Sequence, residues 1–83
     1  MRKLIEKDLT ALVGTVHSGF TIERARVKGG RFSDSDHYGI MLGRNEGGNW
    51  VTWQFHIEDG VQIYWGHYID SEEKALADYE ART

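Results

Sequence analysis

The chain has 83 residues and a formal net charge of −3, and it contains no cysteine and no proline. The absence of cysteine excludes a disulfide framework, a thiolate metal site and a cysteine nucleophile. No apolar run approaches the roughly 20 residues that span a bilayer, and the N-terminus lacks the apolar core of a signal peptide. We therefore expect one cytoplasmic domain over residues 1–83.

The first predicted element is a helix near the N-terminus. Apolar residues recur there with helical spacing, at Ile5, Leu9, Leu12 and Val16, with Leu4 and Val13 beside them. Gly14 costs about 1 kcal/mol relative to alanine in a helix interior. The helix is therefore expected either to end near Gly14 or to continue to Ser18-Gly19, which is a plausible stop.

Residues 20–28 predict a strand whose faces depend on a bulge. In a regular strand one face would hold Phe20, Ile22, Arg24, Arg26 and Lys28. A bulge near Glu23-Arg24 would instead bring together the apolar members Phe20, Ile22, Ala25 and Val27 and direct the arginines outward, as is common in edge strands. Gly29-Gly30 ends this strand, and residues 31–36 predict a loop.

Three further strands are expected at residues 38–42, 50–57 and 61–68. The loop 58–60 makes a hairpin of the last two, with Gly60 suited to a left-handed conformation. One register sorts this hairpin into two faces. The apolar face pairs Ile57 with Val61, Phe55 with Ile63, Trp53 with Trp65, and Val51 with His67. The polar and aromatic face pairs His56 with Gln62, Gln54 with Tyr64, Thr52 with Gly66, and Trp50 with Tyr68.

The chain closes with a predicted helix over residues 70–82. Asp70 is the expected N-cap and Glu73 completes a capping box. An inward stripe is expected from Ala75, Leu76 and Tyr79, and an exposed ladder from Lys74, Asp78 and Arg82. The predicted fold class is α+β, with element order α-β-β-β-β-α and a four-stranded antiparallel sheet that carries both helices on its apolar face.

No motif in the chain predicts catalysis or metal binding. In the register above His56 and His67 lie on opposite faces, and no histidine pair has the spacing of a metal site. The run Asp34-Ser35-Asp36-His37 offers too few oxygen ligands for a divalent cation. The glycine-rich stretches match no phosphate-binding loop, so we expect no catalytic residue, no cofactor and no metal. A small enzyme of unknown class is the remaining alternative.

The positive signal is the polar and aromatic face of the hairpin. Large aromatic side chains on a polar face are enriched at protein interfaces. The interface candidates are Trp50, Thr52, Gln54, His56, Gln62, Tyr64 and Tyr68. They favour a non-enzymatic protein-binding module whose partner includes, as one option, a second copy of the chain. The structural alternative is that residues 31–36, with Phe32, or one end of a helix covers these aromatics.

A second hypothesis is single-stranded nucleic-acid binding, in which aromatics stack bases beside a basic track. The residues for this role are Phe20, Arg24, Arg26, Lys28 and Arg31. Charge is unevenly distributed, at +4 for residues 1–31 and −7 for residues 32–83. Such asymmetry marks an electrostatic surface or is lost when the two parts fold together. The pI of about 5.7 weighs against nucleic acid.

Three segments and the last helix carry a family resemblance. They are Tyr38-Gly39-Ile40-Met41-Leu42-Gly43, Val51-Thr52-Trp53-Gln54-Phe55, Tyr64-Trp65-Gly66-His67-Tyr68 and residues 70–82. The pattern resembles a group of small uncharacterised open reading frames of Gram-positive bacteria and their mobile elements. The resemblance covers residues 38–82, implies a prokaryotic or phage setting and brings no activity with it. Small proteins of that setting often act by stoichiometric binding, as inhibitors of host defence such as anti-CRISPRs do.

Overall fold

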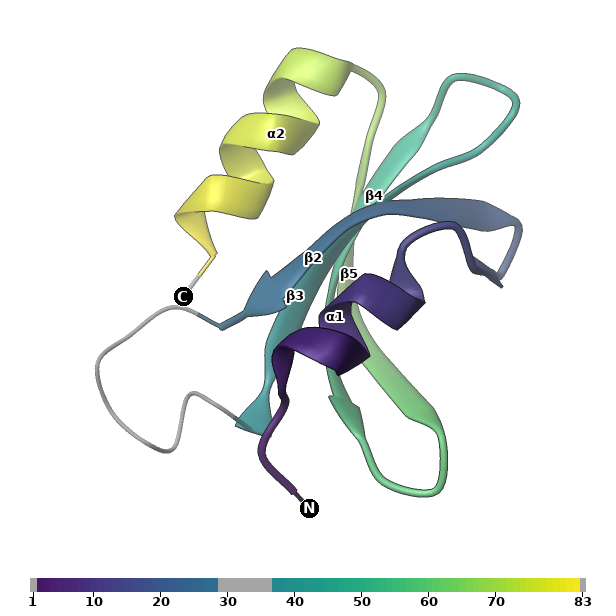
Figure 1. The fold of residues 1–83 in the computed structure, drawn as a ribbon. Coiled ribbons are helices and arrows are strands. Elements are labelled where there is room, and N and C mark those ends of the chain that lie inside the picture. The colour runs from purple at the N-terminus through teal and green to yellow at the C-terminus, as the bar shows by residue number, and fades with distance from the viewer. Residues whose placement is uncertain (1, 29–36, 83) are drawn as a thin grey trace.

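The protein is an α+β fold in which one antiparallel sheet lies between two helices (Figure 1). The computed structural model describes residues 2–28 and 37–82. Its elements in chain order are α1 (Glu6–Leu12), β1 (Val16–His17), β2 (Phe20–Val27), β3 (Gly39–Arg44), β4 (Trp50–Ile57), β5 (Val61–Ile69) and α2 (Glu72–Ala81). The five strands follow one another in the sheet in sequence order. The α+β class is confirmed, and the short strand β1 makes the sheet five-stranded rather than four-stranded.

The two helices cover opposite faces of the sheet, so the prediction that both share one face was wrong (Figure 1). On the face that we call the α1 face, Leu4 and Leu12 pack in one cluster with Met41, Val51, Trp53 and Phe55. On the opposite α2 face, Ala75 and Tyr79 pack against Ile40, Leu42 and Trp50. The physical reason lies in β3, where consecutive apolar residues leave both faces needing cover.

The N-terminal helix is shorter than its apolar pattern allowed. It ends at Leu12, and Gly14 follows with a left-handed φ of +91° that a helix cannot continue. The chain then forms β1 and turns at Ser18-Gly19 into β2. Val16 is consequently 64% exposed instead of lying in the core, and Ile5 is 57% exposed.

The N-terminus of α1 is held by an acidic residue one turn into the helix. Asp8 accepts hydrogen bonds from Arg2 at 2.7 and 2.8 Å and from the backbone N–H of Ile5 at 2.9 Å. The guanidinium of Arg2 is the main reason why the pKa of Asp8 falls to about 2, and the backbone N–H adds to the effect.

The bulge predicted in the Phe20 strand is confirmed. The register passes from Ile22 opposite Gly43 directly to Arg24 opposite Leu42, which leaves Glu23 as the extra residue. Ile22 is therefore buried on the α1 face, where Phe20, Ala25 and Val27 pack around the same cluster. The arginines that follow the bulge lie on the α2 face. Strand β1 pairs only with the first two residues of β2, so within the described residues the part of β2 after the bulge lies at the edge of the sheet.

The hairpin of β4 and β5 is confirmed only in the half nearest its loop. The pairs from Ile57–Val61 to Gln54–Tyr64 occur as predicted. Beyond them the register shifts, so that Thr52 lies opposite His67, Val51 opposite Tyr68 and Trp50 opposite Ile69. The four predicted pairs Trp53–Trp65, Val51–His67, Thr52–Gly66 and Trp50–Tyr68 are therefore wrong.

A second bulge at Trp65-Gly66 causes this shift. Trp65 has a φ of +56°, and a Cβ on Gly66 would come within 2.7 Å of the indole Nε1 of Trp53. The backbone of Gly66 thus packs directly on Trp53 in the place predicted for the Trp65 side chain. Trp65 is 68% exposed in consequence, and the side chains after the bulge change faces.

Helix α2 begins one residue later than expected. Ser71 is its N-cap, since its Oγ accepts a hydrogen bond from the backbone N–H of Lys74 at 3.1 Å, and Asp70 lies before it. The inward stripe of Ala75, Leu76 and Tyr79 is confirmed. None of the described helices has the length and apolar character needed to cross a membrane.

Candidate functional site

Helix α2 covers much of the hairpin face that was predicted to be exposed. Trp50 is 5% exposed, Thr52 is 0% and Gln54 is 4%. Trp50 belongs to the core cluster beneath α2. Of the predicted interface residues only His56, Gln62 and Tyr64 remain on the uncovered part of this face, because Tyr68 has moved to the α1 face beside Phe20 and Trp53.

Arg26 fastens the C-terminal end of α2 to the sheet. Its Nη2 donates to the carbonyl oxygens of Tyr79 and Arg82 at 2.5 and 2.6 Å, and its Nη1 donates to the carbonyl of Val27 at 3.0 Å. The guanidinium also lies 5.0 Å from the centre of the Tyr79 ring. A cation at this position satisfies carbonyls that a helix end leaves without partners.

The predicted nucleic-acid track is therefore not assembled in the form that was expected. Arg26 is occupied by α2, Phe20 lies on the opposite face, and Arg31 lies outside the described residues. Arg24 is exposed. Lys28 lies near the tyrosine that follows the loop, with its ammonium 6.0 Å from the centre of the Tyr38 ring.

A polar network joins α2 to the middle of the sheet. Thr52 donates its hydroxyl hydrogen to Asp78, and His67 donates from Nδ1 to the same carboxylate at 2.9 Å. Arg82 donates to the hydroxyl and the carbonyl of Thr52 at 3.1 and 3.0 Å. Asp78 and Arg82 thus turn toward the sheet, and the prediction that they form an exposed ladder with Lys74 was wrong.

The charge state of Asp78 depends on this network. Burial raises the pKa of Asp78, but the hydrogen bonds from Thr52 and His67, together with the nearby charges of His67 and Arg82, outweigh it and hold the pKa below its usual value. The hydroxyl of Thr52 is fully buried and donates to this carboxylate. The network holds α2 in place.

Beyond the end of α2 the same face opens into a groove of about 390 Å³. We call it the aromatic groove and define it by its lining residues Lys28, Tyr38, Gln54, Tyr64 and Trp65. The rings of Tyr64 and Trp65 lie 5.6 Å apart between centres. The ring of His56 lies near both tyrosines of the groove, with its centre 5.9 Å from that of Tyr38 and 5.3 Å from that of Tyr64.

Two polar groups in and beside the groove lack partners. Gln54 is 4% exposed and lines the groove, and its carboxamide makes no hydrogen bond to any described residue. The Nδ1 atom of His56 is likewise buried without a hydrogen bond within residues 2–28 and 37–82. The carboxamide atoms of Gln54 are not among the fully buried atoms without partners, so they are reached from the groove and can hydrogen-bond to a ligand there.

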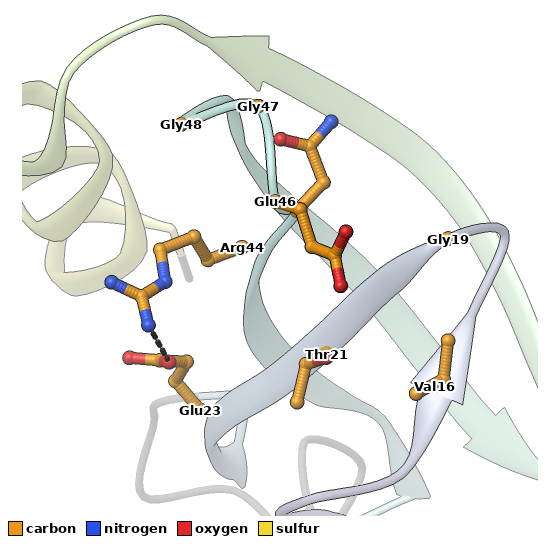
Figure 2. Close-up of a pocket in the computed structure, with 9 residues that line it drawn as sticks. Val16, Gly19, Thr21, Glu23, Arg44, Glu46, Gly47 and Gly48 are labelled. Carbon is orange, nitrogen blue, oxygen red and sulfur yellow. Dashed lines mark ion pairs between the residues drawn. The ribbon is translucent and has the colours of Figure 1, made fainter.

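A second groove of about 800 Å³ lies between the β1–β2 hairpin and the loop that joins β3 to β4. Figure 2 shows the Arg44 side chain reaching toward Glu23, with which it forms an ion pair of 3.5 Å, and Glu46 descending from the loop. None of the lining residues is buried. Exposed charges of this kind are well solvated, and ion pairs between them contribute little free energy. The second groove is therefore a weaker candidate for a binding site.

Sequence reasoning missed two members of the aromatic groove. Trp65 was predicted on the apolar face of the hairpin, but it is exposed. Tyr38 was named in the family resemblance and in no candidate site, and it is half-buried at the groove. The one signal that could have identified Trp65 is the glycine that follows it, since a glycine inside a strand often marks a bulge.

No metal centre accompanies these sites. Within the described part of the chain, no group of three or more histidine and acidic side chains could hold a metal ion. The residues of the predicted loop, including Phe32 and the Asp34–Asp36 run, lie outside the described residues. No protein-family model, curated protein or solved structure matches the chain.

Proposed function

We propose that this protein is a non-enzymatic binding module that holds a protein partner in the aromatic groove. The observation that carries the proposal is Trp65, a large apolar side chain that is 68% exposed at the wall of a groove. Tryptophan and tyrosine dominate the energetics of protein interfaces. Trp65 has Tyr64 and Tyr38 beside it, which makes the exposed apolar surface continuous rather than scattered.

The size of the groove favours a short segment of a partner over a broad flat surface. A volume of about 390 Å³ lies in the range of small-ligand sites and holds two or three side chains. A partner that inserts such a segment would bury the Trp65 indole and reach the carboxamide of Gln54 at the same time.

The family resemblance suggests the setting in which such a module would act. In a phage or mobile element, we propose that the protein serves as an accessory factor or as a stoichiometric inhibitor of a host defence system. This role needs occupancy of a partner and no turnover.

The test compares the removal of aromatic rings at the groove with the removal of an equally exposed ring on the other face of the sheet. Trp65→Ala with Tyr64→Ala removes one wall of the groove, whereas Tyr68→Ala removes a ring that is also 68% exposed but lies on the α1 face. We expect affinity capture from the natural host to recover the same partner with the wild type and with Tyr68→Ala, and to lose it with the double variant. Circular dichroism and thermal unfolding confirm that each variant is folded.

Light scattering on the wild type and the double variant distinguishes a second copy from a different partner. A dimer that dissociates in the double variant would identify the chain itself as the occupant. Retention of the same partner by the double variant would refute the assignment of the groove as the binding site.

A further inference from the structure

The chemistry of the aromatic groove specifies its occupant more closely, and this inference rests on the proposed function. Each of the five lining side chains carries a hydrogen-bond donor, namely the ammonium of Lys28, the hydroxyls of Tyr38 and Tyr64, the amide of Gln54 and the indole N–H of Trp65. None of the five is a carboxylate. Tyr38, Tyr64 and Gln54 also carry acceptor oxygens, whereas Lys28 and Trp65 only donate. All five side chains can therefore donate to a ligand that is rich in acceptors.

The Gln54 carboxamide selects a backbone carbonyl as the central acceptor. It is held on the middle of β4, it is 4% exposed, and it makes no hydrogen bond to a described residue. Its neighbour on the same face of β4, Thr52, is by contrast fully satisfied by Asp78 and Arg82. A partner that accepts from the Gln54 amide would supply a hydrogen bond that the described residues do not provide.

The direction of the groove sets the length of the segment. The lining residues come from the end of β2, the start of β3, the middle of β4 and the bulge of β5, so the groove crosses four neighbouring strands. Three spacings of about 4.8 Å between strands give a length of roughly 14 Å. A polyproline II helix rises about 3.1 Å per residue, so four or five residues span it.

Polyproline II is the conformation that fits a donor-rich aromatic groove across a sheet face. Its carbonyl groups point outward as free acceptors, proline has no N–H that would need a partner, and proline rings pack on tyrosine and tryptophan. Added β-strands pair along a sheet edge instead, and a groove that runs perpendicular to the strands cannot provide that ladder.

We propose that the aromatic groove binds a segment of about five residues in the polyproline II conformation. Its prolines pack against Trp65 and Tyr64, a backbone carbonyl accepts from Gln54, and an acidic side chain lies at Lys28. Lys28 is the single cation among the lining residues. One cation suits one carboxylate, whereas a protein of net charge −3 repels a polyanion such as a nucleic acid.

The experiment uses the full chain labelled with ¹⁵N and three synthetic probes. The first is a decapeptide with Glu-Glu at one end of a Pro-Pro-Ala-Pro-Pro core, the second has Lys-Lys in place of Glu-Glu, and the third is an oligo-dT single strand. We expect the first peptide to shift the side-chain amide of Gln54 and the indole N–H of Trp65, and to bind about two- to fivefold more tightly than the second.

Three variants locate the contacts. Lys28→Gln should abolish the difference between the acidic and the basic peptide, Trp65→Ala should weaken both at least tenfold, and Tyr68→Ala should leave both unchanged. Absence of shifts with either peptide, or tighter binding of oligo-dT at the same resonances, would overturn the inference. If neither peptide binds while the groove variants still lose their captured partner, the polyproline assignment fails and the proposed function stands. If those variants keep the partner, both fail.

Discussion

Substitution of Arg26 by methionine tests how the fold holds α2 on the sheet. Methionine keeps an unbranched apolar stem of similar reach and removes the guanidinium. In the wild type this group donates to the carbonyls of Tyr79 and Arg82, which belong to the last turn and the C-cap of α2. Loss of the guanidinium leaves those carbonyls without their partner and removes a cation from the negative end of the helix dipole.

The expected loss of unfolding free energy is about 2–4 kcal/mol. A hydrogen bond to a charged group contributes roughly 1.5–3 kcal/mol, and two of them reach α2 from Arg26. Two effects bring the expected loss below this sum of about 3–6 kcal/mol. Water can hydrate carbonyls at a helix end, and the Nε atom of Arg26 is itself buried without a hydrogen bond to a described residue, a cost that the substitution removes.

Urea denaturation, followed by tryptophan fluorescence and by circular dichroism, measures this change. A domain of this size has a stability of roughly 4–12 kcal/mol, so the loss would be large enough to resolve. Arg24→Met on the same strand is the matched control, because Arg24 is exposed and should change the stability by less than about 0.5 kcal/mol. If Arg26→Met and Arg24→Met have equal stability, the assignment of Arg26 as the anchor of α2 is refuted.

Two further predictions concern packing and pH. A Cβ at Gly39 would overlap the ring of the fully buried Phe55, so Gly39→Ala should lower the free energy of unfolding in urea by about 1–3 kcal/mol or prevent folding. Gly47→Ala, whose Cβ would have its nearest atom at 3.4 Å, should not. Because the pKa of Asp78 is lower in the folded state, its stabilising effect is complete above the unfolded pKa of about 4 and is lost as the pH falls through the folded value. Asp78→Asn should therefore lose less stability between pH 6 and pH 2 than the wild type or the exposed control Glu80→Gln; an equal loss in all three would contradict this reasoning.

Several features of the fold follow from local patterns. The bulge in β2 was predictable because only one extra residue near Glu23 places the apolar side chains of that strand together. The register of the hairpin near its loop was predictable because a three-residue connection ending in Gly60 leaves one alignment of the two strands. In both cases neighbouring residues carry all the information that is needed.

The second bulge could not be read in the same way. Alternation of apolar and polar residues is satisfied by Trp65 opposite Trp53, and equally by a strand that changes phase at this point. The choice depends on Trp53, whose ring packs against Phe20 of a distant strand and against the backbone of Gly66. The exposed Trp65, and with it the wall of the aromatic groove, is therefore a product of tertiary packing.

The sequence by itself determined the α+β class, the confirmed strands and the apolar stripe of α2, because hydrophobic periodicity and turn residues are local properties. Only the tertiary structure decided which face of the sheet that stripe covers. A stripe of Ala75, Leu76 and Tyr79 can pack on either face of the sheet. Arg26 and Thr52, which are distant from α2 in the sequence, hydrogen-bond to the helix and hold it on the α2 face. That placement buries Trp50 and leaves the aromatic groove open beyond the end of the helix.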